Sequence, residues 1–226
     1  GELDWEKSLG GNDNDVGQSI QQTNEGGYIV GGETKSNTDD VLEQNGHTDF
    51  WIVKLNNLGN IEWSKSLGGT LQDICKDVKQ TVDGGYITVG WAASADGDVS
   101  NNNGIGNGDY WVVKLDNNGN ILWEKTFGGP NWDRAYSVKL AADGGYFVSG
   151  WTTGGVAGFH GGPSDHWVIK IDSLGNLQWE IALGGSGDDI HYAIDKTADN
   201  GCIVVGGTQS NDGDVTGNHG GRDMWV

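Results

Sequence analysis

One unit recurs four times along the chain, and this repetition constrains the fold more than any other feature of the sequence. Tryptophans mark the unit at intervals of 58, 60 and 56 residues: Trp5, Trp63, Trp123 and Trp179. Pairs of glycines keep the same intervals and begin at Gly10, Gly68, Gly128 and Gly184. A period of this length is typical of repeat architectures, in which each copy buries its apolar face against its neighbours. We therefore interpret residues 1–226 as a single domain of four units, approximately 10–67, 68–127, 128–183, and 184–226 together with 1–9.

The third unit shows the strand pattern of one copy. Residues 135–140 alternate and end at Ala-Asp-Gly-Gly, a tight-turn sequence, and 146–151 supply the return strand. Residues 165–171 are rich in β-branched and aromatic side chains, and a second turn leads from them into the fourth strand, 176–183. Four antiparallel strands repeated at a fixed period are typical of propeller blades, whereas the coils of a β-solenoid, the alternative, are normally much shorter.

The two ends of the sequence complement each other. Residues 3–9 match the fourth strand of a unit, and residues 223–226 match the start of a third strand. We therefore expect an all-β propeller of four-stranded antiparallel blades, closed into a ring because the N-terminal strand pairs with the strand that begins at Asp223. Such closure would leave no exposed sheet edge. A longer array or a larger propeller is the alternative.

Three segments of the fourth unit resemble a known repeat. Residues 184–189 (GGSGDD), 199–207 (DNGCIVVGG) and 223–226 (DMWV) resemble the repeat of bacterial β-propeller proteins of the seven-bladed type, and the strand layout is similar to that of NHL repeats. The resemblance covers all four units, but tryptophans replace smaller residues and the loops are long and rich in Asn, Asp and Gly. It implies a propeller in a secreted or surface-bound bacterial protein, and it implies no single activity.

Composition excludes several classes of protein. The chain has 41 glycines, which would destabilise helices, and an all-helical fold is therefore excluded. Its net charge of −19 repels phosphate groups, so we expect no nucleic-acid partner and no direct membrane insertion. The two cysteines, Cys75 and Cys202, are too few for a disulfide scaffold.

Some charged residues recur in every complete unit. An aspartate lies five residues after the start of each Gly-Gly pair, at Asp15, Asp73, Asp133 and Asp189. A lysine follows the tryptophan of each complete third strand, at Lys54, Lys114 and Lys170. Because a ring normally has one active centre, we expect these residues to be structural. The aspartate would cap a turn, or it would pair with a lysine between units.

The long loops between second and third strands carry a different acidic pattern. Asp-Gly-Asp-Val occurs in units two and four, with the carboxylates of Asp96, Asp98, Asp212 and Asp214. Paired carboxylates with nearby carbonyl and amide oxygens suit Ca²⁺, which takes six to eight oxygen ligands. We therefore predict calcium in these two loops, with solvated Asx turns as the alternative. His160 and His219 lie late in the loops of units three and four, and we interpret them as turn residues rather than metal ligands.

Three of the eleven tryptophans break the repeat. Trp91 and Trp151 share one position, where the first unit has Glu33, and Trp132 lies in a loop before a first strand. Aromatic side chains outside the repeated frame are candidates for a ligand platform, and we include Glu33 among the predicted ligand-binding residues. Packing between units is the alternative for Trp91 and Trp151, and Trp132 is the better surface candidate.

These observations favour a non-enzymatic, extracellular binding or adhesion module that recognises a glycan or a protein through its loops. One alternative is a structural spacer in a larger surface protein or filament. The other is a hydrolase or lyase at the central channel, with Glu33 as an acid or base. No pair of non-repeated acids can be placed together from the sequence, which disfavours the enzyme.

Overall fold

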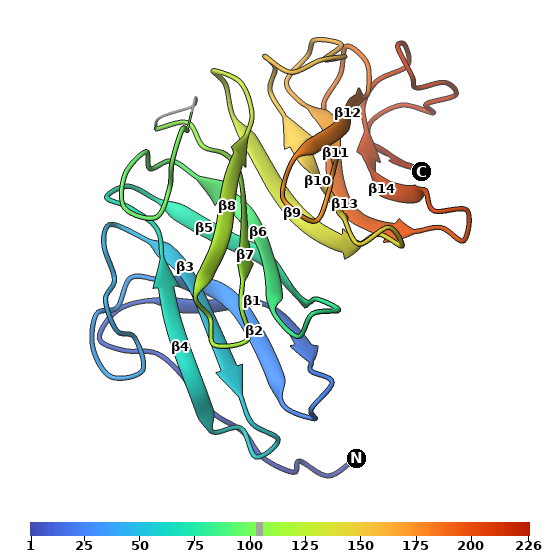
Figure 1. Cartoon of the computed structure of the whole chain (residues 1–226). Coiled ribbons are helices and arrows are strands. Elements are labelled where there is room, and N and C mark those ends of the chain that lie inside the picture. Colours follow the sequence, from blue (N-terminus) through green and yellow to red (C-terminus); the bar gives the residue numbers. More distant parts are fainter. Residues whose placement is uncertain (103–105) are drawn as a thin grey trace.

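The computed structural model describes residues 1–102 and 106–226, and these form an all-β chain of four antiparallel sheets (Figure 1). The first sheet contains β1 (Asp15–Gln22), β2 (Tyr28–Thr34), β3 (Asp49–Leu55) and β4 (Ile61–Leu67). The second contains β5 (Asp73–Gln80), β6 (Tyr86–Ala92), β7 (Asp109–Leu115) and β8 (Ile121–Phe127). The third contains β9 (Asp133–Leu140), β10 (Tyr146–Thr152), β11 (Asp165–Ile171) and β12 (Leu177–Leu183). The fourth contains β13 (Asp189–Lys196), β14 (Cys202–Thr208) and β15 (Asp223–Trp225). The prediction of a repeated four-stranded antiparallel unit is thus confirmed.

Short turns produce the order of strands within each sheet. Between β1 and β2, Gly26 adopts a φ of 93°, which glycine tolerates, and its N–H donates to the carbonyl of Thr23. A Cβ on the next residue, Gly27, would lie 2.2 Å from the carbonyl oxygen of Leu55, so the second glycine is required by close packing. Between β3 and β4, the Asn56 side chain accepts N–H groups of the turn, as an Asx turn does.

The core lies between consecutive sheets. Every residue of β3, β7 and β11 is buried, because each of these strands lies inside its sheet and is covered on both faces. We name the contacts between sheets one and two, two and three, and three and four the first, second and third junctions. An equivalent pair of rings occupies each of them: Phe50 with Trp111, Tyr110 with Trp167, and His166 with Trp225.

The expectation of a closed ring is wrong. The four sheets are separate and lie along an arc, with the first and fourth at opposite ends (Figure 1). β15 pairs with β14 alone, so the fourth sheet has three strands in the described part of the chain. Residues 1–14 form no strand, and the expected pairing of 3–9 with the strand at Asp223 does not occur.

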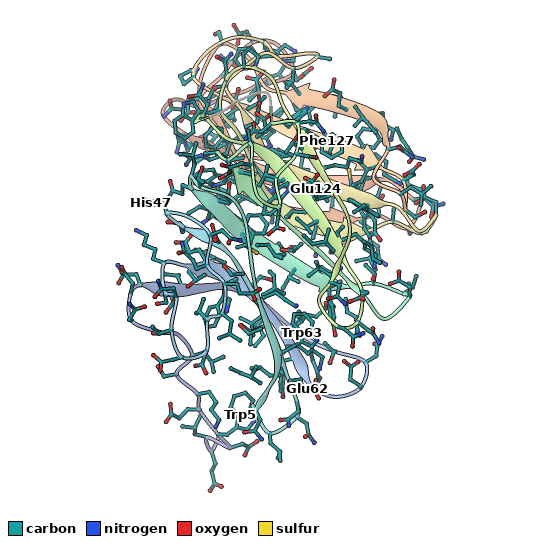
Figure 2. All side chains as sticks on the ribbon, turned by 60° about the vertical axis from the view of Figure 1, so that its left-hand side comes forward. Trp5, His47, Glu62, Trp63, Glu124 and Phe127 are labelled. Carbon is teal, nitrogen blue, oxygen red and sulfur yellow. The ribbon has the colours of Figure 1, made fainter. Side chains whose placement is uncertain are left out.

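The position of Trp5 explains this difference. Its ring packs edge-on against Tyr28 of the first sheet at 5.7 Å between ring centroids, and Trp63 of β4 packs in the same way against Tyr86 of the second sheet at 5.6 Å. Residues 1–9 therefore take the place on the first sheet that β4 takes on the second. Figure 2 places Trp5 and Trp63 at the same, lower end of the molecule. The repeat specifies this local contact, but it does not specify the angle through which successive sheets turn.

The outer faces of the first and last sheets are uncovered. Ile20 of β1 is 62% exposed, whereas its equivalents in the following sheets are buried: Val78, Val138 and Ile194. Ile203 of β14 is 49% exposed, whereas its equivalents in the preceding sheets are buried: Ile29, Ile87 and Phe147. Each end of the array thus presents one half of an interface that is complete at the three junctions. The described residues include no helix that is long and apolar enough to span a membrane.

Candidate functional site

The repeated aspartates bind the backbone at the start of each first strand. The carboxylate of Asp73 accepts the N–H of Gly69 at 2.8 Å, and Asp15, Asp133 and Asp189 accept the N–H of the second glycine of their own pairs at the same distance. The repeated lysines lie near the other end of the sheets and pair with turn carboxylates. Lys114 Nζ lies 3.0 Å from Asp83, Lys170 Nζ lies 2.9 Å from Asp143, and Lys54 pairs with Glu25 and Glu62. These interactions hold turns in place, and a structural role for the repeated residues stays a prediction.

Burial raises the pKa of several aspartates that recur at equivalent positions of the units. The pKa of Asp49 rises to about 6, because the carboxyl is buried and because Asp73 lies nearby. The pKa of Asp133 rises to about 7, mainly through burial and with a contribution from the charge of Asp109. One carboxylate oxygen of Asp49 and one of Asp133 have no hydrogen-bond partner among the described residues. Burial also raises the pKa of Asp165 at the third junction, so each junction includes a carboxyl group whose charged form is unfavourable.

The loop aspartates that we predicted as calcium ligands also cap backbone groups. Asp96 accepts both the N–H and the hydroxyl of Thr70 at 2.8 Å, and Asp98 accepts the N–H of Gly68 at 3.2 Å. In the fourth unit, Asp212 and Asp214 accept the N–H groups of Ser186 and Gly184. Among the described residues, no three His, Cys, Asp or Glu side chains gather as a metal site would require. Calcium binding in these loops stays a prediction.

The two loop histidines contact aspartates. Nδ1 of His160 lies 3.2 Å from the Asp165 carboxylate, and its Nε2 lies 3.5 Å from that of Asp214. Nδ1 of His219 lies 3.0 Å from Asp223. Both histidines thus join the end of a loop to the strand that follows it.

The three tryptophans that break the repeat come together around one arginine. The guanidinium carbon of Arg134 lies 4.4 Å from the ring centroid of Trp91, 4.5 Å from that of Trp132 and 5.3 Å from that of Trp151. These residues come from the end of β6, the loop before β9, the start of β9 and the end of β10. We name them the tryptophan–arginine cluster. It joins the second and third sheets at the end of the sheets where the long loops lie.

The cluster combines a buried tryptophan, Trp91, with a partly exposed one, Trp132. Trp91 is almost fully buried, whereas Trp132 is 38% exposed, and their centroids are 6.5 Å apart. Burial lowers the pKa of the Arg134 guanidinium, while its contact with Tyr136 works in the opposite direction. The Trp132 backbone is held by hydrogen bonds with Thr153. The exposed indole is therefore positioned by neighbours on several sides, and a cation lies against its ring.

Sequence reasoning missed Arg134, although a signal was present. The other units have apolar residues at this position: Val16, Ile74 and Ile190. A single arginine at an otherwise apolar repeat position was the clue. Glu33, the fourth proposed ligand residue, lies on β2 of the first sheet and is not part of the cluster. Its Oε2 is buried without a hydrogen-bond partner among the described residues, and a catalytic role for Glu33 stays a prediction.

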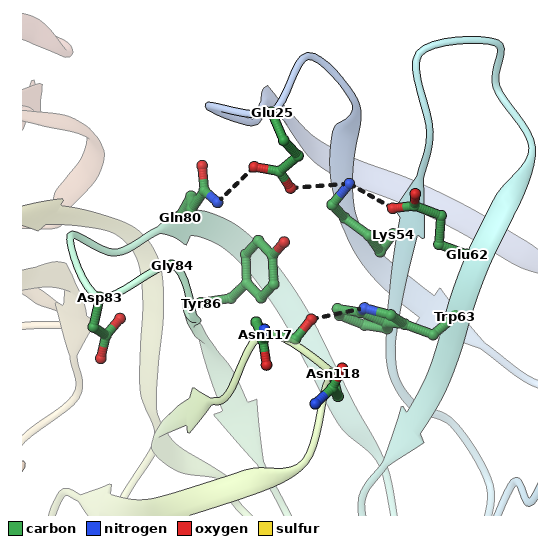
Figure 3. Close-up of a pocket in the computed structure, with 10 residues that line it drawn as sticks. All are labelled: Glu25, Lys54, Glu62, Trp63, Gln80, Asp83, Gly84, Tyr86, Asn117 and Asn118. Atoms are coloured by element: carbon green, nitrogen blue, oxygen red, sulfur yellow. Dashed lines mark hydrogen bonds and ion pairs between the residues drawn. The ribbon is translucent and has the colours of Figure 1, made fainter.

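A second candidate site lies at the first junction, at the end of the sheets away from the long loops (Figure 3). This open cavity of about 570 Å³ is lined by Glu25, Lys54, Glu62, Trp63, Gln80, Asp83, Gly84, Tyr86, Asn117 and Asn118. We name it the first-junction cleft. The indole N–H of Trp63 donates to the carbonyl of Asn117 at 3.1 Å and links the first sheet to a turn of the second. None of our sequence-based site predictions included this cleft.

Lys54 organises one wall of the first-junction cleft. Its ammonium group lies 3.1 Å from Glu25 and 2.8 Å from Glu62, and it donates to the carbonyl of Leu55 (Figure 3). Partial burial raises the pKa of Glu25, but hydrogen bonds from its backbone, Gln80 and Lys54 outweigh this effect and lower it to about 2. Glu25 is therefore charged at neutral pH, and the lysine is enclosed by acceptors.

No protein-family model matches the chain. The chain is 28% identical over 182 residues to "Regulatory protein FlaEY" of Caulobacter vibrioides. The match covers 74% of this chain and 19% of that protein, so the chain spans about a fifth of the length of the relative it matches.

Proposed function

We propose that this chain is a non-enzymatic binding module of a bacterial protein outside the cell or on its surface, and that it recognises a glycan or a protein through the tryptophan–arginine cluster. One observation carries this proposal: the three tryptophans that break the repeat meet at one place, around Arg134. The repeated residues maintain the frame, so residues that depart from the repeat are the ones free to serve recognition.

The chemistry of the cluster supports a binding role. Trp and Arg are enriched among the residues that dominate binding energy at interfaces. Trp132 presents a half-exposed indole beside the long loops, and its position is supported by buried neighbours. The net charge of −19 favours a neutral or cationic partner over an anionic one.

The similar Caulobacter protein is described as a regulatory protein. A regulatory role is compatible with a module that binds another molecule and does not transform it. Because the chain corresponds to a fifth of that protein, we propose that the module is one part of a longer repeat protein.

The test compares two exposed aromatic residues. We expect Trp132→Ala to reduce binding on a glycan array at least tenfold and to leave the fold intact, because the indole is at the surface. Tyr192→Ala is the control, since Tyr192 is 63% exposed and lies outside the cluster. Equal binding by both variants would exclude the cluster as the site. An array with no bound glycan would remove the glycan alternative and direct the search to proteins.

A second candidate function, a structural array, is supported by the uncovered end faces. Ile20 and Ile203 are exposed at positions where the three junctions bury their equivalents. We propose that further sheets of the same bacterial propeller-type repeat cover these faces in a longer protein. The isolated chain should then associate head to tail in sedimentation velocity as its concentration rises, and Ile20→Lys should suppress this association. A chain that stays monomeric at millimolar concentration contradicts the proposal.

A further inference from the structure

We propose that the first-junction cleft binds a neutral carbohydrate of about disaccharide size. The cleft lies at the opposite end of the sheets from the tryptophan–arginine cluster and shares no residue with it. It is therefore a second binding site, and it does not depend on the function proposed for the cluster.

The size and rigidity of the first-junction cleft suit a small ligand. Its volume of about 570 Å³ lies within the range of roughly 300–1,000 Å³ that is common for small-molecule sites. Three turns and residues of β3, β4, β5 and β6 form its walls (Figure 3). The Trp63–Asn117 hydrogen bond crosses the junction, and Trp63 packs edge-on against the buried Tyr86. A ligand would thus enter a site that is largely formed in advance.

The charges of the cleft disfavour ionic ligands. Lys54 is 3% exposed and is already bound by Glu25 and Glu62, so it is not available to a phosphate, sulfate or carboxylate. Asp83 adds a third carboxylate at the rim, paired with Lys114, and these negative charges repel an anion. A metal ion is also disfavoured, because the described residues contain no group of three metal-binding side chains.

The remaining polar groups match hydroxyl groups. The Glu62 carboxylate is 47% exposed and uses one oxygen for Lys54, which leaves the other to accept a hydrogen bond. The side-chain amides of Asn117 and Asn118 lie exposed at the opposite rim and can both donate and accept. A sugar hydroxyl likewise donates and accepts, and the carbon-bound hydrogens of a sugar ring pack on aromatic side chains such as Trp63. A neutral carbohydrate uses all of these groups at once.

The second junction provides an internal comparison. The same frame recurs there, since the Trp123 indole donates to the carbonyl of Ser173 at 3.2 Å and Lys114 pairs with Asp83. The polar lining does not recur, because Leu122, Leu140 and Leu174 replace Glu62, Gln80 and Asn118. The hydrogen-bonding groups of the first-junction cleft are therefore not required to build a junction.

This comparison also supplies the test variant. We expect Glu62→Leu combined with Asn118→Leu to fold normally, since leucine occupies both positions in the second junction. The probes are the neutral disaccharides maltose, cellobiose, lactose and chitobiose, with glucose 6-phosphate as the anionic probe. Binding is measured by isothermal titration calorimetry and by tryptophan fluorescence on the complete chain.

The expected result is millimolar or tighter binding of at least one neutral disaccharide, weakened at least tenfold in the double variant. Gln178→Leu, at the position equivalent to Glu62 in the third unit, should bind the disaccharide normally. Asn117→Ala should weaken binding without changing the melting temperature. Failure of all four disaccharides to bind overturns the proposal, as does stronger binding of glucose 6-phosphate or unchanged binding by the double variant. Loss of binding in Trp132→Ala would move the carbohydrate to the cluster and also overturn it.

Discussion

The first and third junctions use the same repeat positions and fill them with different chemistry. In the first, Phe50 packs edge-on against Trp111 at 4.6 Å, beside the buried Cys75. In the third, His166 takes the place of Phe50 and His191 takes that of Cys75, with 5.8 Å between the two imidazole centroids. The backbone frame therefore tolerates either a wholly apolar contact or a pair of titratable rings.

The imidazole pair makes the third junction the more sensitive of the two. His166 and His191 are almost fully buried, and Nδ1 of His191 has no hydrogen-bond partner among the described residues. Burial lowers the pKa of both rings, and that of His191 falls to about 3 with a contribution from His166. Unpaired polar groups are costly in a core, so this contact stabilises the array less than its apolar counterpart does.

The largest expected effect tests whether the capping aspartates of the first and third junctions, Asp73 and Asp189, contribute equally to stability. Asp73 accepts hydrogen bonds from Gly69 and Ser94, and Asp189 accepts them from Gly185, Thr208 and Ser210. Replacing either residue with alanine leaves several buried donors unpaired, so Asp73→Ala and Asp189→Ala should each lower the free energy of unfolding by about 3 kcal/mol. Urea denaturation measures both losses. A loss below about 1 kcal/mol for one variant alone would show that the caps are not equivalent.

The next prediction concerns acid sensitivity of the third junction. The folded-state pKa values of His166 and His191 lie below those of the unfolded chain, so protonation favours unfolding and stability is lost as the pH falls below about 6.5. The hydrogen-exchange protection factors of β13 and β14 should therefore fall between pH 7 and pH 5 more than those of β2 and β3.

The matched control for this prediction copies the second junction into the third. His166→Tyr with His191→Ala reproduces the Tyr110–Ala135 pair and should remove this loss of protection. Asp165, Asp189 and His160 also lie near this junction, so a response that persists in the double variant would show that the imidazole pair is not its source.

The first junction should respond to pH with the opposite sign. The pKa of Asp49 is raised to about 6 by burial and by Asp73. Its contribution to stability is therefore fully present below the unfolded pKa near 4 and is lost as the pH rises through about 6. Asp49→Asn should remove about 1–2 kcal/mol of this pH dependence in denaturation curves measured from pH 5 to pH 8. A profile that is unchanged by the substitution would show that Asp49 ionises without penalty.

The smallest expected effect is that of calcium. The loop aspartates occur at the first and third junctions (Asp98 and Asp214) but not at the second, and they already accept backbone N–H groups. Saturating Ca²⁺ would add about 2.7 kcal/mol at a hundred times the dissociation constant, and competition with the existing bonds should reduce this gain. Melting should rise with millimolar Ca²⁺ more than with matched NaCl, and Asp98→Asn with Asp214→Asn should abolish the rise. Identical melting temperatures in EDTA and in calcium would show that these aspartates only cap backbone groups and bind no calcium.

The sequence predicted the two candidate sites only in part, and the physical reason differs between the cluster and the cleft. Trp91, Trp132 and Trp151 could be identified because they depart from the repeat, but their convergence on Arg134 depends on two sheets meeting. The first-junction cleft was missed because its lining comes from turns of two units. Glu62 and Asn118 are ordinary polar surface residues until the junction brings them to one opening.

The sequence by itself determined the all-β character of the chain, the four units and the positions of their strands. These depend on local properties: the alternation of side chains along a strand, the glycines of tight turns and the self-similarity of the units. The tertiary structure alone decided that the sheets form an open arc, that residues 1–9 pack on the first sheet, and that a cleft opens at the first junction. The rotation from one sheet to the next depends on how side chains such as Phe50 and His166 fill each junction, and no pattern within a single strand specifies that angle.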